Sequence, residues 1–297
     1  MPRVLLRDAQ HSFFFGLLRL DDAARIEVPR QARPAILLFD RVTPMAYSAL
    51  QHVAAVIITR DAEATLAATL DSLVRFPEVV IYDNGSRDGT VALAQRYRNV
   101  TVHTGEFLGF GPTRNCAAAL ATCDWIFAVD ADERADTALV DAIDALRLDD
   151  LQQVCAVFRR NYCLGKYIRF GDWGNDRLVR LYHRTQHAYT NAAVHEKLQR
   201  SEHTRVVRLT GALHHAAVTD LRQLLEKINT YSEIRKDTSD RYYSPPVVFL
   251  KMHWAFFRSY VLRLGALDGW RGLVIAVSIA TDVFFKYMKI YARRQGL

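Results

Sequence analysis

The sequence predicts an α/β fold built on a doubly wound, mostly parallel sheet. Three features between residues 53 and 130 support this: apolar runs rich in β-branched residues, intervening segments with apolar residues at helical spacing, and polar clusters where the runs end. Regular alternation of strands and helices over short spacings is typical of parallel βα units, in which helices cover both faces of the sheet.

The elements follow one another in a regular order. Strands are expected at residues 53–59, 79–82, 100–104 and 125–130. Helices are expected at residues 61–74, 90–98 and 112–123. Asp61 directly precedes the first helical run and is its candidate N-cap.

After Leu151 the pattern changes to strands separated by loops rich in Gly, Asn and aromatic residues. These strands are expected at residues 154–165, 177–184 and 203–209. After residue 215 the chain is expected to be helical, with a break at 242–246 where two prolines occur. We therefore expect three regions: a partly disordered extension at 1–50, an α/β domain at 51–215, and a helical, membrane-associating region at 216–297. Met45 is an alternative start, and whether residues 1–44 are native stays open.

The positive charge of the chain is concentrated at one end. The net charge is +7, and the last 47 residues hold eight Lys or Arg and two Asp, a local charge of +6. This favours an anionic partner for that end, such as a membrane surface. Nucleic acid is excluded as the partner, because no recognition module is visible. The apolar runs fall short of the roughly 18 residues of a spanning helix. The sequence thus indicates a cytoplasmic protein that lies peripherally on the inner face of the cell membrane.

The last segment has the pattern of an amphipathic helix. At 100° per residue, a mainly basic face carries Arg271, Lys286, Lys289 and Arg293, together with Asp282. The opposite face carries apolar and aromatic residues: Trp270, Leu273, Val274, Val277, Phe284, Phe285, Met288 and Tyr291. This arrangement suits a membrane interface. The alternative is a helix that packs on its own domain with a solvated polar face.

Three polar clusters follow the ends of predicted strands: residues 59–61, 83–90 and 130–133. In an open α/β sheet, ligands bind beyond the carboxyl ends of the strands, so the clusters are expected to converge on one site. Asp130 and Asp132, two residues apart, form a compact oxygen-ligand pair for Mg²⁺ or Mn²⁺. Each cluster also has a structural interpretation. Residues 83–90 resemble a turn, and 130–133 resemble an acidic helix start.

Together these segments resemble the family 2 inverting glycosyltransferases of the GT-A fold. The motifs are "AVIITRDAEATLAATLDSL", "VVIYDNGSRDGT", "RNCAAALATCDWIFAVDADE" and "AAVHEKL", and they cover residues 53–215 in the family's order. The stretch "GDWGNDRLVRLYHR" and the later "RLGALDGWRGL" are most similar to the bacterial lipopolysaccharide inner-core β-glucosyltransferase group. One departure is that Asp61 and Ala62 stand where the family usually has Asn-Glu. Glu63 is a candidate substitute through a shift of one residue.

The resemblance implies roles for individual residues in a nucleotide-sugar site. Thr59 and Asp83 match positions that bind uracil and ribose. Asp88 matches the second acid of that motif, which either binds the nucleotide or holds the loop. Arg114 would approach the diphosphate, and Arg180 is a candidate anchor for it. Asp130 and Asp132 match the DxD motif, with Asp132 expected to bind the metal ion directly.

Inversion also requires a general base that deprotonates the acceptor hydroxyl. Glu196, in "VHE", is the preferred base, and Asp172 and Asp176 are its rivals. A list of candidate acceptor or donor contacts completes the site: Trp173, Asp172, His195, and either His214 or His215. Glu196 could instead be a solvated loop acid paired with Lys197, and Trp173 a packed core residue.

The resulting hypothesis is a metal-dependent hexosyltransferase. The expected donor is UDP-glucose, and the expected acceptor is a lipid-linked saccharide such as the lipopolysaccharide inner core, at a membrane surface. Two alternatives stay open. One keeps the chemistry but uses a polyprenyl-phosphate, capsule or protein acceptor. The other is a non-catalytic, nucleotide-binding membrane scaffold.

Overall fold

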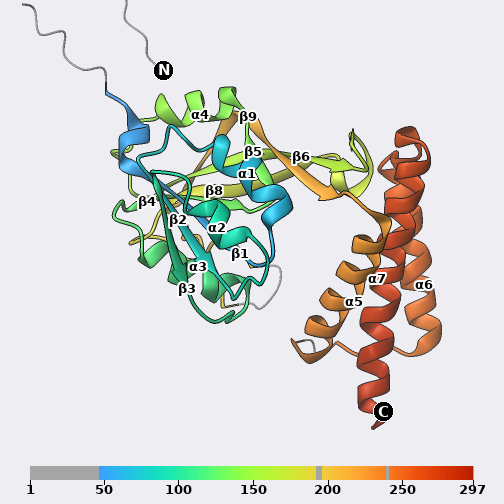
Figure 1. The fold of residues 1–297 in the computed structure, drawn as a ribbon. Coiled ribbons are helices and arrows are strands. Elements are labelled where there is room, and N and C mark those ends of the chain that lie inside the picture. The colour runs from blue at the N-terminus through green and yellow to red at the C-terminus, as the bar shows by residue number, and fades with distance from the viewer. Residues whose placement is uncertain (1–46, 192–195, 239–240, 297) are drawn as a thin grey trace, which may run out of the picture. The chain divides into compact units, whose positions relative to one another are not determined.

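The computed structural model describes residues 47–191, 196–238 and 241–296, which belong to the compact unit that begins at residue 46 (Figure 1). Most of the extension expected at 1–50 therefore lies outside the described residues. The strands are β1 Val53–Thr59, β2 Glu78–Asp83, β3 Val100–Thr104, β4 Trp125–Asp130, β5 Glu133–Ala135, β6 Gln153–Cys163, β7 Lys166–Tyr167, β8 Asp176–His183 and β9 Arg205–Val218. The helices are α1 Glu63–Asp71, α2 Thr90–Ala94, α3 Phe110–Ala119, α4 Thr137–Asp144, α5 Leu221–Thr238, α6 Pro245–Phe257 and α7 Trp270–Arg294. Short helical turns occur at Ala49–His52, Gly171–Trp173, Arg258–Leu262 and Gly265–Asp268.

The strands form one sheet in the order β3-β2-β1-β4-β8-β6-β9-β5, with β7 paired to β6. The first four strands in this order are parallel, as predicted, and β8 then joins β4 antiparallel. Side chains of α1, α2 and α4 pack on one face of the sheet and those of α3 on the other. The predicted doubly wound α/β class is confirmed, with a mixed second half.

The predicted helix starts need correction. The N-cap position of α1 is Ala62, because Asp61 adopts a positive φ of 50° and its carboxylate accepts from the Arg87 N–H instead. The segment 130–133 is not a helix start either. Glu133 begins strand β5, and α4 begins at Thr137, where the Asp136 side chain accepts from the Leu139 N–H.

Strand β9 is longer than predicted and passes the boundary expected at residue 215. It runs parallel to β6 as far as the pair of Cys163 with Val218. The extension contains small or apolar residues, "AAV", and the Ala216 N–H donates to the Asp132 carbonyl at 3.2 Å. Helix α5 follows after two residues, so β9 connects the sheet directly to the helical region.

The last three helices pack together, with α7 in contact with both α5 and α6 (Figure 1). None of the described helices is long and apolar enough to span a membrane. Two basic residues of α7 bond within the protein. Arg271 donates to the carbonyls of Cys163 and Leu164, and Lys289 pairs with Glu233 of α5 at 2.6 Å. The exposed large apolar side chains of α7 are Trp270, Leu273, Val277 and Phe285, and Arg293 and Arg294 are exposed at its C-terminal end.

We predict that Asp136→Ala lowers the free energy of unfolding by about 1–2 kcal/mol, because its Oδ1 caps α4 and also accepts from Ala212 of β9 at 3.0 Å. The matched control is Asp141→Ala in the same helix. Its side chain is 59% exposed and pairs with Arg75 on the surface, so the change should stay within about 0.5 kcal/mol. Urea denaturation followed by circular dichroism measures both. Equal losses in the two variants would contradict the assigned cap.

Candidate active site

The predicted polar clusters meet at the carboxyl edge of the parallel strands. Thr59 at the end of β1 is in register with Asp83 at the end of β2. On the other side of β1, Ile58 is in register with Asp130 at the end of β4. The structure therefore brings the three clusters to one edge, as the topology rule predicts.

Asp83 and Thr59 occupy the end of this edge expected to bind a nucleoside. Asp83 is 2% exposed, and its carboxylate accepts from the N–H groups of Gly85 and Ser86 at 3.0 and 2.9 Å. This arrangement is an Asx turn that shapes the loop after β2. The Thr59 hydroxyl is buried and has no partner in the described part of the chain. A buried hydroxyl without a partner is costly, which indicates a place for a ligand.

The loops after β1 and β2 are held together by reciprocal hydrogen bonds. Asp88 accepts from the Glu63 N–H at 3.1 Å, and Glu63 accepts from the Gly89 N–H at 3.0 Å. The hydrogen bond from the Thr90 hydroxyl to Asp88 lowers the pKa of that carboxyl. Asp88 and Glu63 therefore act in holding the loop, which favours the structural option for Asp88. The N–H groups at the start of α1 find their acceptors in the neighbouring loop.

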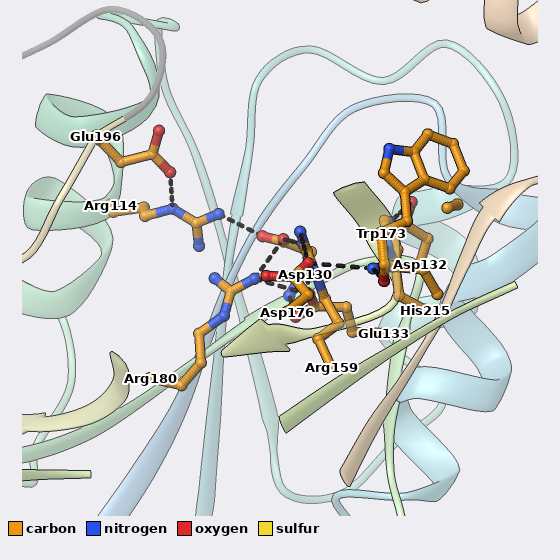
Figure 2. Close-up of polar contacts among 12 residues, drawn as sticks. Arg114, Asp130, Asp132, Glu133, Arg159, Trp173, Asp176, Arg180, Glu196 and His215 are labelled. Atoms are coloured by element: carbon orange, nitrogen blue, oxygen red, sulfur yellow. Dashed lines mark hydrogen bonds and ion pairs between the residues drawn. The ribbon is translucent and has the colours of Figure 1, made fainter. Parts of the chain in front are cut away.

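A buried ion network surrounds Asp130 (Figure 2). Its two carboxylate oxygens accept from different guanidinium groups, one from Arg114 of α3 and one from Arg180 of β8 at 2.7 Å. Both arginines are about 95% buried. Burial raises the pKa of the Asp130 carboxyl, but the charges of Arg114 and Arg180 outweigh it and hold that pKa well below its usual value.

Glu133 and Arg159 belong to the same network, although the sequence assigned them no role. Glu133 is fully buried and accepts from Arg180 at 2.7 Å and from Arg159 at 3.2 Å. Its second oxygen accepts from the Asp130 N–H, which fixes the turn between β4 and β5. The available signal was the acid at position 133, which closely follows an apolar strand. Its arginine partners lie far along the chain and left no local pattern.

Asp132 lies outside this network and faces a histidine of β9. Its Oδ2 is 3.3 Å from the Nε2 of His215. The Nδ1 of His215 is 2.7 Å from the side-chain oxygen of Asn161, so the ring is oriented from both sides. Burial raises the pKa of Asp132. The hydrogen bond and the electrostatic interaction with His215 lower this pKa by more, so the net shift is downward. Of the two adjacent histidines, the structure places His215 and not His214 beside the DxD motif.

The Asp132–His215 pair fits a divalent cation only as part of a larger ligand set. One carboxylate and one imidazole are oxygen and nitrogen donors that Mn²⁺ and Mg²⁺ accept. Among the described residues, no group of three or more His, Cys, Asp or Glu is placed to hold a metal ion. Counted together, Asp132 and the neighbouring network have five carboxylates and three arginines: Asp130, Asp132, Glu133, Asp176 and Glu196, against Arg114, Arg159 and Arg180. This net acidic site could receive a phosphorylated ligand only if a cation reversed the local sign.

Several buried donors in this region have no partner among the described residues. They are Arg114 Nη1, Arg180 Nε and the Tyr189 hydroxyl. The Arg114 guanidinium lies 5.5 Å from the centroid of the Tyr189 ring, so at least two of these donors lie close together. Unpaired buried N–H groups on arginines indicate an anionic ligand in this place.

Glu196 approaches the network from the side of α3. Its Oε1 accepts from Arg114 Nε at 3.0 Å, and Arg114 thus connects it to Asp130 (Figure 2). The flanking backbone is anchored by Asn115, whose side-chain amide bonds both the N–H and the carbonyl of Tyr189. Glu196 is therefore not a solvated acid paired with Lys197. His195 lies outside the described residues.

The remaining predicted residues lie in different surroundings. Asp176 accepts from Arg159 Nε at 2.8 Å and from Asn161 at 3.1 Å, which places it inside the ion network. Asp172 instead pairs with Arg258 and Arg263 of the helical region. Trp173 is half-buried and packs on an apolar cluster, and its carbonyl accepts from Asn161. His214 contacts the Tyr162 hydroxyl at 3.0 Å and Asp136 at 3.5 Å, away from the DxD motif.

Comparisons with known proteins agree on one family. The model of glycosyl transferase family 2 matches residues 54–210. A relative from Rhizobium meliloti (strain 1021), the lipopolysaccharide core biosynthesis glycosyltransferase LpsC, is 30% identical over 257 residues, which cover 81% of this chain and 92% of LpsC. The uncharacterized glycosyltransferase RT0209 of Rickettsia typhi is 24% identical, over 81% of this chain and 87% of its own length.

The chain also shows a likeness to the crystal structure of S. aureus TarS 1-349 in complex with UDP. The identity is 17%, the coverage is 83% of this chain and 92% of that chain, and the TM-score is 0.40. At this TM-score no conclusion rests on the likeness, and the family assignment rests on the sequence matches.

We predict that Glu133→Ala lowers the free energy of unfolding by about 3–5 kcal/mol, because it leaves two buried guanidinium groups with one carboxylate fewer. Glu133→Gln should lose less, since the amide keeps an oxygen that accepts from Arg180. The control is Glu202→Ala, whose side chain is 87% exposed and whose loss should stay within about 0.5 kcal/mol. Chemical denaturation measures all three. If Glu133→Ala matched Glu202→Ala, the network would not be a stabilising element.

Proposed function

The chain belongs to glycosyl transferase family 2 and is a glycosyltransferase, and from this premise we propose that it moves glucose from UDP-glucose, with inversion, onto a lipid-linked saccharide such as the lipopolysaccharide inner core, using bound Mg²⁺ or Mn²⁺. The observation that carries the proposal is the pairing of Asp132 with His215 beside buried arginines that keep unpaired N–H groups. The similarity to LpsC, whose name places it in lipopolysaccharide core biosynthesis, supports the acceptor class.

The proposed donor site runs along the carboxyl edge of the sheet. Thr59 and Asp83 contact the nucleoside, and the free N–H groups of Arg114 and Arg180 donate to the diphosphate. Asp132 and His215 hold the metal ion, and Asp130 keeps the two arginines in place. The bound cation supplies positive charge that stabilises the departing UDP.

We assign Glu196 as the general base. One of its oxygens is held by Arg114, and no contact to its second oxygen, Oε2, occurs in the described part of the chain. A base needs a free lone pair within reach of the acceptor hydroxyl, and Oε2 has one. Asp176 is the rival, although one of its oxygens already accepts from both Arg159 and Asn161.

The acceptor and the location complete the proposal. A lipid-linked acceptor requires the enzyme to work at a membrane surface, and we assign the helical region after β9 to that contact, at the cytoplasmic face of the cell membrane. The basic character of the last 47 residues supports an anionic surface. A polyprenyl-phosphate, capsule or protein acceptor would use the same donor chemistry, and turnover on each class of acceptor separates them.

The donor is tested by measuring UDP release from UDP-glucose, UDP-galactose and UDP-N-acetylglucosamine with a lipid-linked saccharide present. We predict release from UDP-glucose that depends on Mn²⁺ or Mg²⁺ and is lost on chelation. Asp132→Asn should lower Mn²⁺-stimulated UDP binding at least about tenfold, because it removes a charged ligand. Asp124→Asn, an acid at the other end of β4, is the control. Absence of turnover with every donor would refute the proposal.

The base is tested by Glu196→Gln, which preserves the acceptor oxygen for Arg114. We predict a fall in kcat of about 10²–10⁴-fold with UDP affinity unchanged within about threefold. Asp176→Asn, measured beside it, tests the rival base. Glu202→Gln, an exposed acid six residues away, should leave kcat unchanged. If Glu196→Gln kept full turnover and Asp176→Asn lost it, the base would be Asp176.

A further inference from the structure

The turn between α6 and α7 exposes a concentration of large apolar side chains. We call these residues the apolar tip: Phe257, Val261, Leu262, Leu264, Leu267, Trp270 and Leu273. Each is between 41% and 63% exposed. Leu264 also adopts a left-handed conformation, with φ of 58°, which is unfavourable for a leucine. A contiguous apolar run of this kind at a surface marks an interaction site.

Basic residues outnumber acidic ones around the apolar tip, where Asp172 pairs with two of the arginines. Between residues 245 and 281 the basic residues are Lys251, Arg258, Arg263 and Arg271, and the one acid is Asp268. Asp268 is 4% exposed, because its carboxylate accepts from the N–H groups of Arg169 and Phe170. The surface therefore combines exposed leucines and a tryptophan with positive charge. This is the chemistry of proteins that bind the interface of an anionic lipid bilayer.

A second copy of the chain fits this surface less well. A symmetric contact between two apolar tips would bring like charges together, which is unfavourable across an interface. A bilayer with anionic headgroups instead satisfies the leucines and the arginines at once. The charge complementarity therefore favours lipid as the occupant.

The apolar tip is bonded to the loop that precedes β8. Asp172 pairs with Arg258 at 3.3 Å and also with Arg263, and the Gly171 N–H donates to the Arg263 carbonyl at 2.8 Å. Together with Asp268, these contacts hold residues 169–172 against the tip. We call this set of contacts the clamp.

The same loop leads into the candidate active site. The carbonyl of Trp173 accepts from Asn161, and Asn161 contacts both His215 and Asp176. Trp173 and Asn161 thus form a hydrogen-bonded path from the clamped loop to the Asp132–His215 pair. A bilayer bound at the apolar tip would lie next to the part of the site that Trp173 adjoins.

We propose that the apolar tip inserts into the interface of an anionic bilayer, and that the clamp thereby sets the site at the membrane surface where a lipid-anchored acceptor is presented. The contact with lipid stands on the tip alone. The part that concerns the acceptor rests on the proposed function. The inserting element is the α6–α7 turn, and not the basic face of α7, whose Arg271 and Lys289 bond within the protein.

The test is flotation of the full chain with vesicles of phosphatidylcholine, with and without about one third phosphatidylglycerol. The variant Leu264→Ser/Leu267→Ser should reduce the bound fraction at least about tenfold, because two half-exposed leucines lose the gain from leaving water. The matched control is Val74→Ser/Leu151→Ser, which removes two exposed apolar residues of the α/β domain. Unchanged thermal unfolding confirms that all variants fold.

Turnover separates this inference from the proposed function. In the tip variant, UDP release with an acceptor embedded in vesicles should fall in parallel with flotation, while release with a deacylated, water-soluble saccharide stays unchanged. Equal flotation of tip variant and parent overturns the proposal, as does flotation that ignores phosphatidylglycerol. The parent chain could instead form a dimer that dissociates in the tip variant, and fail to float with vesicles. That outcome would overturn the lipid contact and assign the tip to a second copy of the chain. Flotation without any UDP release refutes the proposed function and leaves the lipid contact standing.

Discussion

The acids Asp130 and Glu133, at the turn from β4 to β5, impose the main constraint on this structure. Asp130 and Glu133 lie at the carboxyl edge of the sheet, and an ionised carboxylate in such a place is stable only when charged partners surround it. Those partners come from three elements: Arg114 on α3, Arg159 on β6 and Arg180 on β8. The placement of β8 beside β4, and of β6 beside β8, therefore serves both the core and the site. The network also leaves N–H groups unpaired, which gives it a chemical use beyond stability.

Much of the sheet could be predicted because its signals are local. The runs that form β1, β3 and β4 were predicted with their observed bounds, since each apolar stretch is directly flanked by polar residues. Helix boundaries were less accurate. Helix α2 ends at Ala94 and not near residue 98, because the following N–H groups form tighter bonds to carbonyls three residues back. The predicted N-cap of α1, Asp61, was wrong for a related reason. The N–H groups of Ala62 and Glu63 donate to side chains that follow β2, Thr90 and Asp88.

The site was predictable in its location but not in its internal pairing. Convergence of Thr59, Asp83 and Asp130 follows from parallel topology alone. The choice between His214 and His215 depends on which face of β9 meets Asp132, because neighbouring residues of a strand point to opposite faces. That face is set by the register with β6, which shifts at two irregularities and has no local sequence signal. The arginine partners of Glu133 were missed because long-range ion pairs leave no periodicity.

The length of chain between the acids and their partners bears on how the protein is made. During synthesis the parallel strands and Glu133 leave the ribosome before Arg159 and Arg180 do. At about 5–20 residues per second, the 47 residues from Glu133 to Arg180 take roughly 2 to 9 seconds. In the first part of that interval, before Arg159 emerges, Arg114 is the one arginine of the network available to the two acids. The carboxyl end of β4 therefore stays open to water until β8 has been synthesised and has paired with β4. We infer that the two halves of the sheet fold together and not one after the other.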